Sequence, residues 1–497
     1  MIFRDWLKEL DYTLLQGSVD VETEDVIYDS RKAAPGKVFV AMKGIRVDGH
    51  SFIPQVLKAG VRVLVTERPV EEELKNSGLS EDELKQVTVV MVEEGRHALA
   101  LLSAARFDHP AKKLVMIGVT GTKGKTTTTH MIRAILLAAG KKVGMIGTTG
   151  TVIGDVVTPT LNTTPESYEL HQAFAQMVEA GCEYAVMEVS SQGIKMHRTD
   201  GLYFNYAIFT NISPDHIGPG EHADFEEYLY YKTRLLNMCG IGLVNKDDEH
   251  APQIIKAANC ELYTYSEESK EADFVASDIR YVSQPDFVGT EFHISGKYDM
   301  EVRLGIPGLF NVVNALAAVS VCSFLGLDQA RISHALENIR VNGRMEIVYT
   351  SERCTVLVDY AHNAVSMESL LSTLRDYKPK RLVCVFGCGG NRSKDRRYSM
   401  GEIGGKMADL SIITADNSRY EKVEDIIADI RGSIEKTGGK FIEIPDRREA
   451  IRYSILHAQP GDMVAVIGKG HEDYQEINGV RHHFLDREVI EETVKEL

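Results

Sequence analysis

A buried-strand pattern that leads directly into a glycine-rich turn and then into a helix constrains this fold more than any other feature. The apolar run at residues 114–119 is typical of a strand inside a parallel sheet, and residues 125–139 carry a helical pattern that stops at Gly140. The turn between them reads Thr120-Gly121-Thr122-Lys123-Gly124-Lys125-Thr126-Thr127. Its glycines let backbone N–H groups converge on a phosphate at the positive end of a helix. The pattern predicts a nucleotide-binding α/β domain.

The turn also carries the side chains that phosphate chemistry needs. Lys125 can reach the β- and γ-phosphates of a nucleotide, and the Thr126 hydroxyl can ligate Mg²⁺. The usual eight-residue pattern would have its first glycine at the position of Val119, so an ordinary glycine-rich strand-to-helix turn is the alternative. Because the strand, the helix and Gly-Lys-Thr occur together, we predict nucleotide contacts from Gly121, Thr122, Lys123, Gly124, Lys125, Thr126 and Thr127.

Acidic and imidazole groups follow the next strand patterns. Glu188 stands near the end of the apolar run at 184–189, and Asp215-His216 follows the run at 206–210. Open α/β sheets carry their ligand groups at the carboxyl ends of the strands, and a phosphate-bound Mg²⁺ needs an acidic partner there. Taken alone, such residues are more often a surface carboxylate and a hydrogen-bonded histidine. Here they are candidate metal-site groups.

Strands alternate with helices from about residue 110 to the end of the chain. The sequence predicts strands at 143–146, 184–189, 206–210, 242–245, 355–359, 381–386, 410–414 and 463–467. Alternation of this kind predicts doubly wound, mostly parallel sheets. A proline after the helical pattern at 98–106, and a second α/β series that begins near Arg344, divide the chain. We predict an α/β protein of three domains, at 1–108, 109–338 and 339–497.

Composition excludes several classes of function. Hydrophobic residues make up 43% of the chain and charged residues 26%, as in folded globular proteins. The net charge of −16 opposes nonspecific binding to nucleic acid or to anionic lipid. The most apolar stretch, at 315–327, is too short to span a membrane, and the N-terminus shows no secretory pattern. With seven scattered cysteines, these features predict a cytoplasmic protein with no nucleic-acid partner and no membrane insertion.

Short motifs along nearly the whole chain resemble the Mur ligase family. They are Gly121-Thr122-Lys123-Gly124-Lys125-Thr126-Thr127, Asn162-Thr163-Thr164, Glu188-Val189-Ser190-Ser191, Thr210-Asn211, Asp215-His216, Phe310-Asn311-Val312-Val313-Asn314-Ala315, Gly343-Arg344-Met345-Glu346 and Asp359-Tyr360-Ala361-His362-Asn363. Three others are similar to the member that adds the third peptide residue: Asp29-Ser30-Arg31, Gly387-Cys388-Gly389-Gly390-Asn391-Arg392 and Gly468-Lys469-Gly470-His471-Glu472.

The resemblance implies an ATP-dependent ligase of peptidoglycan precursor synthesis, with a central P-loop domain and a Rossmann-like C-terminal domain. ATP would phosphorylate the D-Glu γ-carboxylate of UDP-N-acetylmuramoyl-L-Ala-D-Glu, and the amine of a diamino acid would displace the phosphate. The first domain would bind the UDP moiety, the second ATP and Mg²⁺, and the third the amino acid. Bringing two anions together demands charge neutralisation by Lys125 and Mg²⁺.

The resemblance also implies roles for single residues. The catalytic set would be Lys125, Lys232, Glu188 and His216, and the metal set Thr126, Glu188, His216 and Lys232, with Lys232 carbamylated by CO₂. Judged from the sequence alone, Lys232 is a solvated lysine on a helix. Further ATP contacts would come from Asn311, Arg344, Asp359 and His362. The UDP-substrate would contact Ser30, Asn162, Thr163, Thr164, Ser190 and Arg198. Met196 and residues 217–222 depart from the pattern of the family.

The amino-acid site would comprise Arg397, Asp416, Asn417, Arg419, Gly468 and Glu472. Asp416-Asn417-Ser418-Arg419 resembles the Asp-Asn-Pro-Arg motif of diaminopimelate-adding members, with Ser418 in place of proline. A guanidinium can bind the distal carboxylate of meso-diaminopimelate in a bidentate manner, whereas it would repel the terminal ammonium of lysine. We therefore favour meso-diaminopimelate, with L-lysine as the alternative.

Two other functions remain open from the sequence. One is a related ATP-dependent amide ligase, either another Mur ligase or a folylpolyglutamate synthetase, which the motifs at 416–419 and 468–472 oppose. The other is a nucleotide-binding regulatory protein that has lost catalysis. The joint presence of Lys125, Glu188, His216, Lys232 and Arg344 opposes that interpretation.

Overall fold

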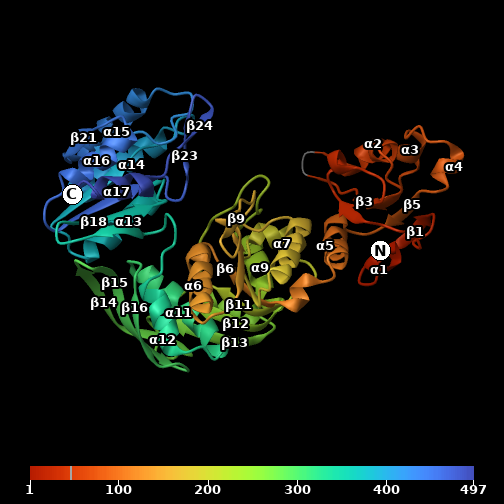
Figure 1. Ribbon diagram of the computed structural model, residues 1–497, viewed down its shortest axis with the longest axis horizontal. Coiled ribbons are helices and arrows are strands. Elements are labelled where there is room, and N and C mark those ends of the chain that lie inside the picture. Colours follow the sequence, from red (N-terminus) through yellow and green to blue (C-terminus); the bar gives the residue numbers. More distant parts are fainter. Residues whose placement is uncertain (45–46) are drawn as a thin grey trace. The chain divides into compact units, whose positions relative to one another are not determined.

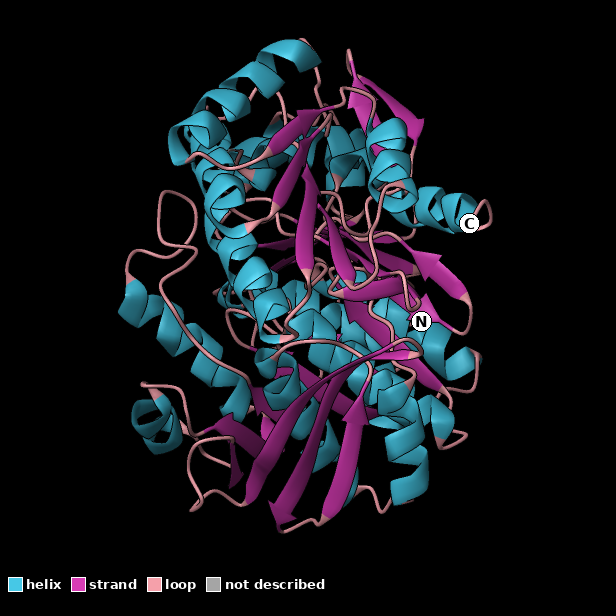
Figure 2. Ribbon diagram, turned by 90° about the vertical axis from the view of Figure 1, so that its left-hand side faces the viewer, coloured by secondary structure: helices cyan, strands magenta, loops and turns pink. Residues whose placement is uncertain are grey.

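The computed structural model describes residues 1–44 and 47–497 and contains two compact units (Figure 1). The first comprises Met1–Asp273 with Ala317–Gly326, and the second Phe274–Leu316 with Leu327–Leu497. In each unit, helices pack around sheets (Figure 2). The fold is mixed α/β, as predicted, and the three domain boundaries stay a prediction. None of the helices in the described part of the chain combines the length and the apolar character needed to cross a bilayer.

The N-terminal part of the first unit, coloured red to orange in Figure 1, is built on a five-stranded sheet. Only its edge pair is antiparallel, and the order is β1 (Thr13–Gln16), β5 (Thr88–Met91), β4 (Val63–Thr66), β3 (Lys37–Val40), β2 (Asp25–Ile27). Val38 and Val40 pack with helix α5, whereas Phe39 faces α2, because side chains alternate along a strand. Its helices are α1 (Phe3–Trp6), α2 (Ile53–Lys58), α3 (Glu71–Lys75), α4 (Glu81–Leu84) and α5 (Gly95–Arg106).

The rest of the first unit is built on strands that run in the order β13, β12, β11, β6, β10, β7, β8, β9. Pairing is parallel from β13 to β7, and the hairpin of β8 and β9 is antiparallel. The bounds are β6 (Val115–Thr120), β7 (Val143–Gly147), β8 (Gly150–Ile153), β9 (Val156–Thr158), β10 (Tyr184–Glu188), β11 (Phe204–Phe209), β12 (Cys239–Asn245) and β13 (Glu261–Ser266). Since β6 lies between β10 and β11, the ends of these three strands meet at one edge.

Helices cover this sheet and shield a continuous core. Phe174 and Met177 of α7 pack with Met116, Met187 and Phe204, all of them buried. Burial of side chains of this size contributes about 1.5–3 kcal/mol each. The helices are α6 (Lys125–Ala138), α7 (Ser167–Glu179), α8 (Ser191–Lys195), α9 (Phe225–Thr233) and α10 (Ala251–Ala257).

The second unit begins with an antiparallel meander of β14 (Phe274–Gln284), β15 (Phe287–Gly296) and β16 (Met300–Leu304), followed by the start of α11 (Leu309–Phe324) and by α12 (Gln329–Glu337). A six-stranded sheet follows, in the order β17 (Glu346–Thr350), β18 (Cys354–Asp359), β22 (Asp462–Ile467), β19 (Arg381–Phe386), β20 (Leu410–Ile413), β21 (Phe441–Glu443). The remaining elements are α13 (Ala364–Asp376), α14 (Asp395–Met407), α15 (Val423–Thr437), α16 (Arg447–Leu456), α17 (Asp486–Val494), β23 (Tyr474–Ile477) and β24 (Val480–His483).

A buried ion pair lies beneath the six-stranded sheet. The Arg447 guanidinium, wholly shielded from solvent, donates to both carboxylate oxygens of Asp486 at 2.7 and 2.6 Å. It also donates to the carbonyl oxygens of Ala415 and Ile467 at 3.2 and 3.0 Å. Burial alone would lower the pKa of Arg447, but the Asp486 carboxylate raises it. The guanidinium therefore ties together the ends of β20 and β22.

Candidate active site

The glycine-rich turn is hydrogen-bonded to the residues that follow β11. Gly121 has a φ of +145°, and a Cβ atom there would lie 1.9 Å from the Thr210 hydroxyl oxygen, so only glycine fits. The carbonyl oxygen of Lys123 accepts hydrogen bonds from the Thr210 hydroxyl at 2.6 Å and from the Asn211 amide at 3.1 Å. These contacts shape the turn so that helix α6 begins at Lys125.

Two amino groups meet inside this turn. The Nζ atom of Lys125 donates to the carbonyl oxygen of Gly121 at 2.8 Å, and the Nζ atom of Lys232 donates to the same oxygen at 2.7 Å. Lys232 is on α9, only 2% exposed, with its Nζ atom 4.7 Å from the centre of the Tyr228 ring. Burial lowers the pKa of Lys232 well below its usual value, and the Lys125 ammonium lowers it further. Lys232 is therefore a buried amine whose charged form is destabilised by its surroundings, not the solvated lysine that the sequence alone suggested.

Glu188, at the end of β10, is the acidic partner of the turn. Its carboxylate is buried and accepts hydrogen bonds from the Thr126 hydroxyl at 3.0 Å and from the Thr148 backbone N–H at 2.9 Å. The Thr148 hydroxyl donates to the second oxygen at 3.2 Å. Hydroxyl and carboxylate oxygens are the ligands that Mg²⁺ prefers, so this oxygen-only set fits that ion. Thr148 was missed in the sequence, although it follows the end of β7 at the same sheet edge.

The residues predicted to bind the UDP-substrate adjoin Glu188 through its main chain. The Thr164 hydroxyl donates to the Glu188 carbonyl oxygen at 3.0 Å and accepts from the Ser190 N–H at 2.9 Å. The Arg198 guanidinium donates to the Thr164 carbonyl oxygen at 3.0 Å and pairs with Glu166 at 2.7 Å. The Thr163 hydroxyl lies 3.1 Å from that of Thr148, and Asn162 is exposed beside it. The structure thus groups these predicted residues at one strand end.

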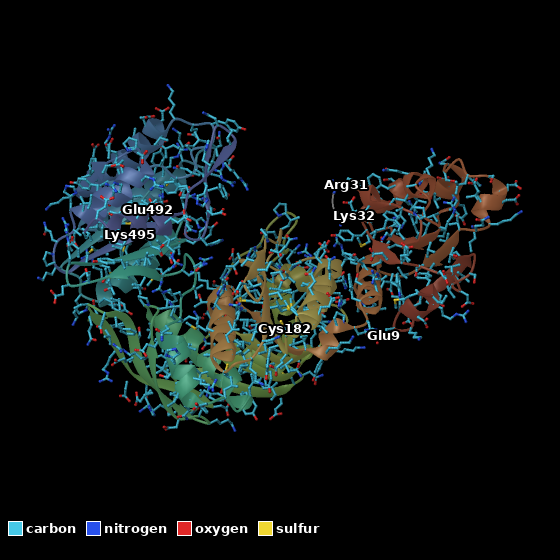
Figure 3. All side chains as sticks on the ribbon, in the orientation of Figure 1. Glu9, Arg31, Lys32, Cys182, Glu492 and Lys495 are labelled. Atoms are coloured by element: carbon cyan, nitrogen blue, oxygen red, sulfur yellow. The ribbon has the colours of Figure 1, made fainter. Side chains whose placement is uncertain are left out.

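Ser30 is separate from this group and follows β2 of the N-terminal sheet. It starts a short 3-10 helix, Ser30–Lys32, and its neighbours Arg31 and Lys32 are labelled in Figure 3. Lys32 of this helix, but not Ser30, lines a cavity of about 210 Å³ together with Asp25, Val26, Ile27, Tyr28, Lys37 and Tyr168. The lining is polar, and its Asp25 carboxylate pairs with Lys37 at 3.2 Å and accepts the Tyr168 hydroxyl at 3.1 Å.

His216 is exposed and pairs with Asp215 and Glu221 of its own segment, not with Glu188. Its Nδ1 atom lies 3.2 Å from a Glu221 carboxylate oxygen, and its φ is +54°. The atypical segment at 217–222 forms a small loop, closed by a bridge between Ile217 and His222. The buried His222 ring holds this loop against α8, with its Nε2 atom 2.9 Å from the Ser191 hydroxyl oxygen. Of the predicted metal-site residues, the structure brings together Thr126 and Glu188, while Lys232 meets the same turn at Gly121.

The further residues predicted to contact ATP belong to the second unit. Asp359 ends β18, where its carboxylate accepts the N–H groups of Met345 and Ala361, both at 2.8 Å. Burial raises the pKa of Asp359. The Arg344 guanidinium lies 4.9 Å from the centre of the Tyr360 ring, and the His362 Nδ1 atom is 2.8 Å from the Tyr360 carbonyl oxygen. Asn311 is buried in α11 and donates to the Pro307 carbonyl oxygen at 2.6 Å.

Four of the residues predicted for the amino-acid site converge at the ends of β20 and β22. The Asn417 amide donates to the Glu472 carboxylate at 2.9 Å. A Cβ atom at Gly468 would lie 2.7 Å from the Asp416 carboxylate, so the two strand ends are in close contact. Lys469, to which the sequence analysis assigned no role, is fully buried, and its Nζ atom lies 3.4 Å from Glu472. These groups form one polar cluster in the second unit.

The two arginines predicted for that site differ in their surroundings. Arg419 has a φ of +52°, and its guanidinium donates to the Gly390 carbonyl oxygen at 2.7 Å, with Glu476 at 3.6 Å. Its side chain stays 24% exposed, so it retains donors for a ligand. Arg397 is 1% exposed and is paired with both Glu421 and Asp429, at 2.8 and 2.9 Å. The structure therefore joins Arg397 to carboxylates of its own chain.

Comparison with known proteins identifies the family. Residues 23–107 match a model described as Mur ligase family, catalytic domain, residues 119–322 match the Mur ligase middle domain, and residues 343–470 match the Mur ligase, glutamate ligase domain. The chain is 39% identical to UDP-N-acetylmuramoyl-L-alanyl-D-glutamate–2,6-diaminopimelate ligase of Caldanaerobacter subterraneus subsp. tengcongensis, covering 99% of this chain and 98% of that protein. It is 38% identical to the enzyme of the same name from Clostridium perfringens, covering 99% of both.

A solved structure agrees with these matches. It is titled as a UDP-N-acetylmuramoyl-L-alanyl-D-glutamate–2,6-diaminopimelate ligase and superposes with a TM-score of 0.73 at 30% identity, covering 95% of each chain. The likeness therefore extends over both units. This chain belongs to the Mur ligase family.

Proposed function

We propose that this protein is the ATP-dependent ligase that joins meso-2,6-diaminopimelate to UDP-N-acetylmuramoyl-L-Ala-D-Glu. In the first step, the γ-carboxylate of D-Glu attacks the γ-phosphorus of ATP, which gives an acyl phosphate and ADP. In the second step, the amine of diaminopimelate attacks the acyl carbon, the amide bond forms, and inorganic phosphate leaves. The observation that carries this proposal is the likeness, over almost the full chain, to ligases named for that reaction.

The first unit supports the phosphoryl-transfer step. Lys125 would leave the Gly121 carbonyl oxygen to bind the β- and γ-phosphates, with the backbone N–H groups of the turn around them. Thr126 and Glu188, already in contact, would hold Mg²⁺, with His216 as a further candidate ligand. The ion would neutralise charge as the two anions approach. In the second unit, Arg344, Asp359, His362 and Asn311 remain our candidates for contacts to the nucleotide.

The state of Lys232 supports carbamylation. A neutral amine can attack CO₂, forming an N–C bond and releasing one proton, whereas an ammonium cannot. Burial and the nearby Lys125 both favour the neutral amine. The carbamate would give the site an anionic oxygen group beside the turn. Wild-type protein supplied with ¹³C-labelled bicarbonate should show a carbamate carbon resonance in NMR spectra that is missing from Lys232→Met. A resonance of equal size in both would reject this assignment.

The polar cluster of the second unit supports the choice of amino acid. The half-buried Arg419 guanidinium suits the distal carboxylate of diaminopimelate, and Glu472 and Asp416 suit its ammonium. Ser418, which replaces the proline of related motifs, is buried with its carbonyl oxygen against Gly390. Since two carboxylates already engage Arg397, we assign it a positioning role there.

Phosphate release tests the proposal directly. The protein would be given ATP, Mg²⁺ and UDP-N-acetylmuramoyl-L-Ala-D-Glu, with either meso-diaminopimelate or L-lysine. We expect a strong preference for diaminopimelate. Arg419→Lys should lower its kcat/KM about 10- to 100-fold, the equivalent of a charged hydrogen-bond pair. Preference for lysine would overturn the choice of amino acid, and no release with either would overturn the reaction.

A further inference from the structure

A histidine–aspartate–histidine cluster lies outside the groups described so far. His97 belongs to the first turn of α5, and His197 and Asp200 belong to the segment at 196–200 that follows α8. One carboxylate oxygen of Asp200 is within hydrogen-bond distance of both rings, 2.6 Å from Nδ1 of His97 and 2.8 Å from Nδ1 of His197. The two rings stand edge to face, with centroids 6.4 Å apart. Two elements about a hundred residues apart in the chain thus meet at one oxygen.

The cluster is held in place from several sides. His197 has a φ of +55°, a backbone conformation uncommon for a residue other than glycine. Backbone hydrogen bonds fix this segment, from the N–H of His197 to Ile194 and from that of Arg198 to Gly193. The hydrogen-bonded segment therefore places the Asp200 carboxylate between the two imidazole rings.

We propose that His97, His197 and Asp200 form a binding site for a divalent transition-metal ion, with Zn²⁺ as the best fit. Two imidazole nitrogens and one carboxylate oxygen form a set that Zn²⁺ accepts, with water in the fourth position. One ligand atom from each of the three side chains lies within 4.8 Å of the others. Around tetrahedral Zn²⁺ the ligand atoms would be about 3.4 Å apart. The ion would therefore replace the two hydrogen bonds to Asp200, now 2.6 and 2.8 Å long, and widen both separations.

The geometry also distinguishes this site from the candidate magnesium site. There, Thr126 and Glu188 offer oxygen alone, which favours a hard cation. Here, nitrogen ligands favour a softer ion. The side chains of His97 and His197 are 43% and 40% exposed, so an ion can enter from solvent. A bound ion would link α5 to the segment that carries Arg198.

Metal binding by the full-length protein tests this proposal. After treatment with a chelator, the protein would be dialysed against Zn²⁺ and its metal content measured, and Co²⁺ would serve as a visible-spectrum probe of the coordination. The test variants are His97→Asn, whose amide can still donate to Asp200, and Asp200→Asn. We expect either change to weaken binding by at least the 10- to 100-fold that is typical of disturbing a metal site. Zn²⁺ should raise the unfolding temperature of the wild type and not that of the variants.

Three controls exclude other sites on the chain. Glu188→Gln alters the candidate magnesium site and should keep the Co²⁺ spectrum. A double change of His482 and His483 to alanine, at an exposed histidine pair, should keep it as well. Binding by the free cysteines would add a thiolate-to-cobalt absorption band, which we do not expect. Zn²⁺ content and Co²⁺ spectra that are equal in wild type, His97→Asn and Asp200→Asn would overturn the proposal.

Discussion

Replacing Asp486 with asparagine should destabilise the second unit strongly, because it leaves the buried Arg447 guanidinium without its counter-ion. The pair makes two charge-assisted hydrogen bonds, at 2.7 and 2.6 Å, each typically worth about 1.5–3 kcal/mol. The asparagine amide would also direct N–H groups at the guanidinium. Breaking one side of a buried pair costs about 3–5 kcal/mol. For a folding unit of about 200 residues, this corresponds to a fall of roughly 6–20 °C in the midpoint of thermal unfolding.

Differential scanning calorimetry of wild type and Asp486→Asn measures this shift. The matched control is Glu496→Gln, which breaks a solvent-exposed pair with Arg452 and should leave the unfolding midpoint nearly unchanged, because water screens such pairs. Because Arg447 also binds the carbonyl oxygens that precede Asp416 and Gly468, the KM for diaminopimelate should rise in Asp486→Asn alone. An unfolding midpoint within about 2 °C of the wild type would refute the reasoning.

Other changes probe the first unit. Gly121→Ala should weaken ATP binding about tenfold or more, because Cβ would collide with Thr210 and φ is +145°. A fluorescent ATP analogue measures this. Gly140→Ala is the control, since Gly140 also has a positive φ, of +77°, but no neighbour within 4 Å, and this variant should bind ATP normally. Lys232→Met should lower phosphate release about 100-fold while ATP binding persists, and release at the wild-type rate would contradict a catalytic role. Burial, and secondarily His109, lower the pKa of His171 to about 3, below the unfolded value of about 6.5. Between pH 6.5 and pH 3 the His171 ring is protonated in the unfolded state and not in the folded state. The free energy of unfolding therefore falls as pH falls from about 6.5 towards 3. In His171→Leu, urea unfolding should show less acid loss than in wild type, and equal losses would refute this assignment.

Much of the fold could be predicted because its strands are buried on both faces. Each strand expected from an apolar run is present, with small shifts at its ends, as at β6 and β22. The antiparallel meander of β14 to β16 was missed, since only the first three residues of β14 are buried and half-buried residues then alternate with exposed ones over 277–280. A period of two residues was the available signal there.

The site was predictable where chemistry is local in the sequence, and not where it depends on tertiary contacts. The turn at 121–127 and its neighbour Glu188 follow from strand ends alone. The burial of Lys232 could not be predicted, because α9 carries tyrosines and charged residues with no marked apolar face. The ion pairs of Arg397 could not be predicted either, because its carboxylate partners, Glu421 and Asp429, are 24 and 32 residues away in the sequence.

Glu188 contacts both the predicted nucleotide-binding turn and the residues predicted to bind the UDP-substrate. Its carboxylate accepts a hydrogen bond from the Thr126 hydroxyl of the turn, and its carbonyl oxygen accepts one from the Thr164 hydroxyl. The Thr164 carbonyl oxygen in turn accepts a hydrogen bond from Arg198. A shift of this strand end on binding one substrate would change the contacts offered to the other. Thermodynamic linkage then requires that each substrate alter the affinity of the other by the same factor. The two substrates would therefore act as reciprocal effectors, through one peptide unit at the end of β10.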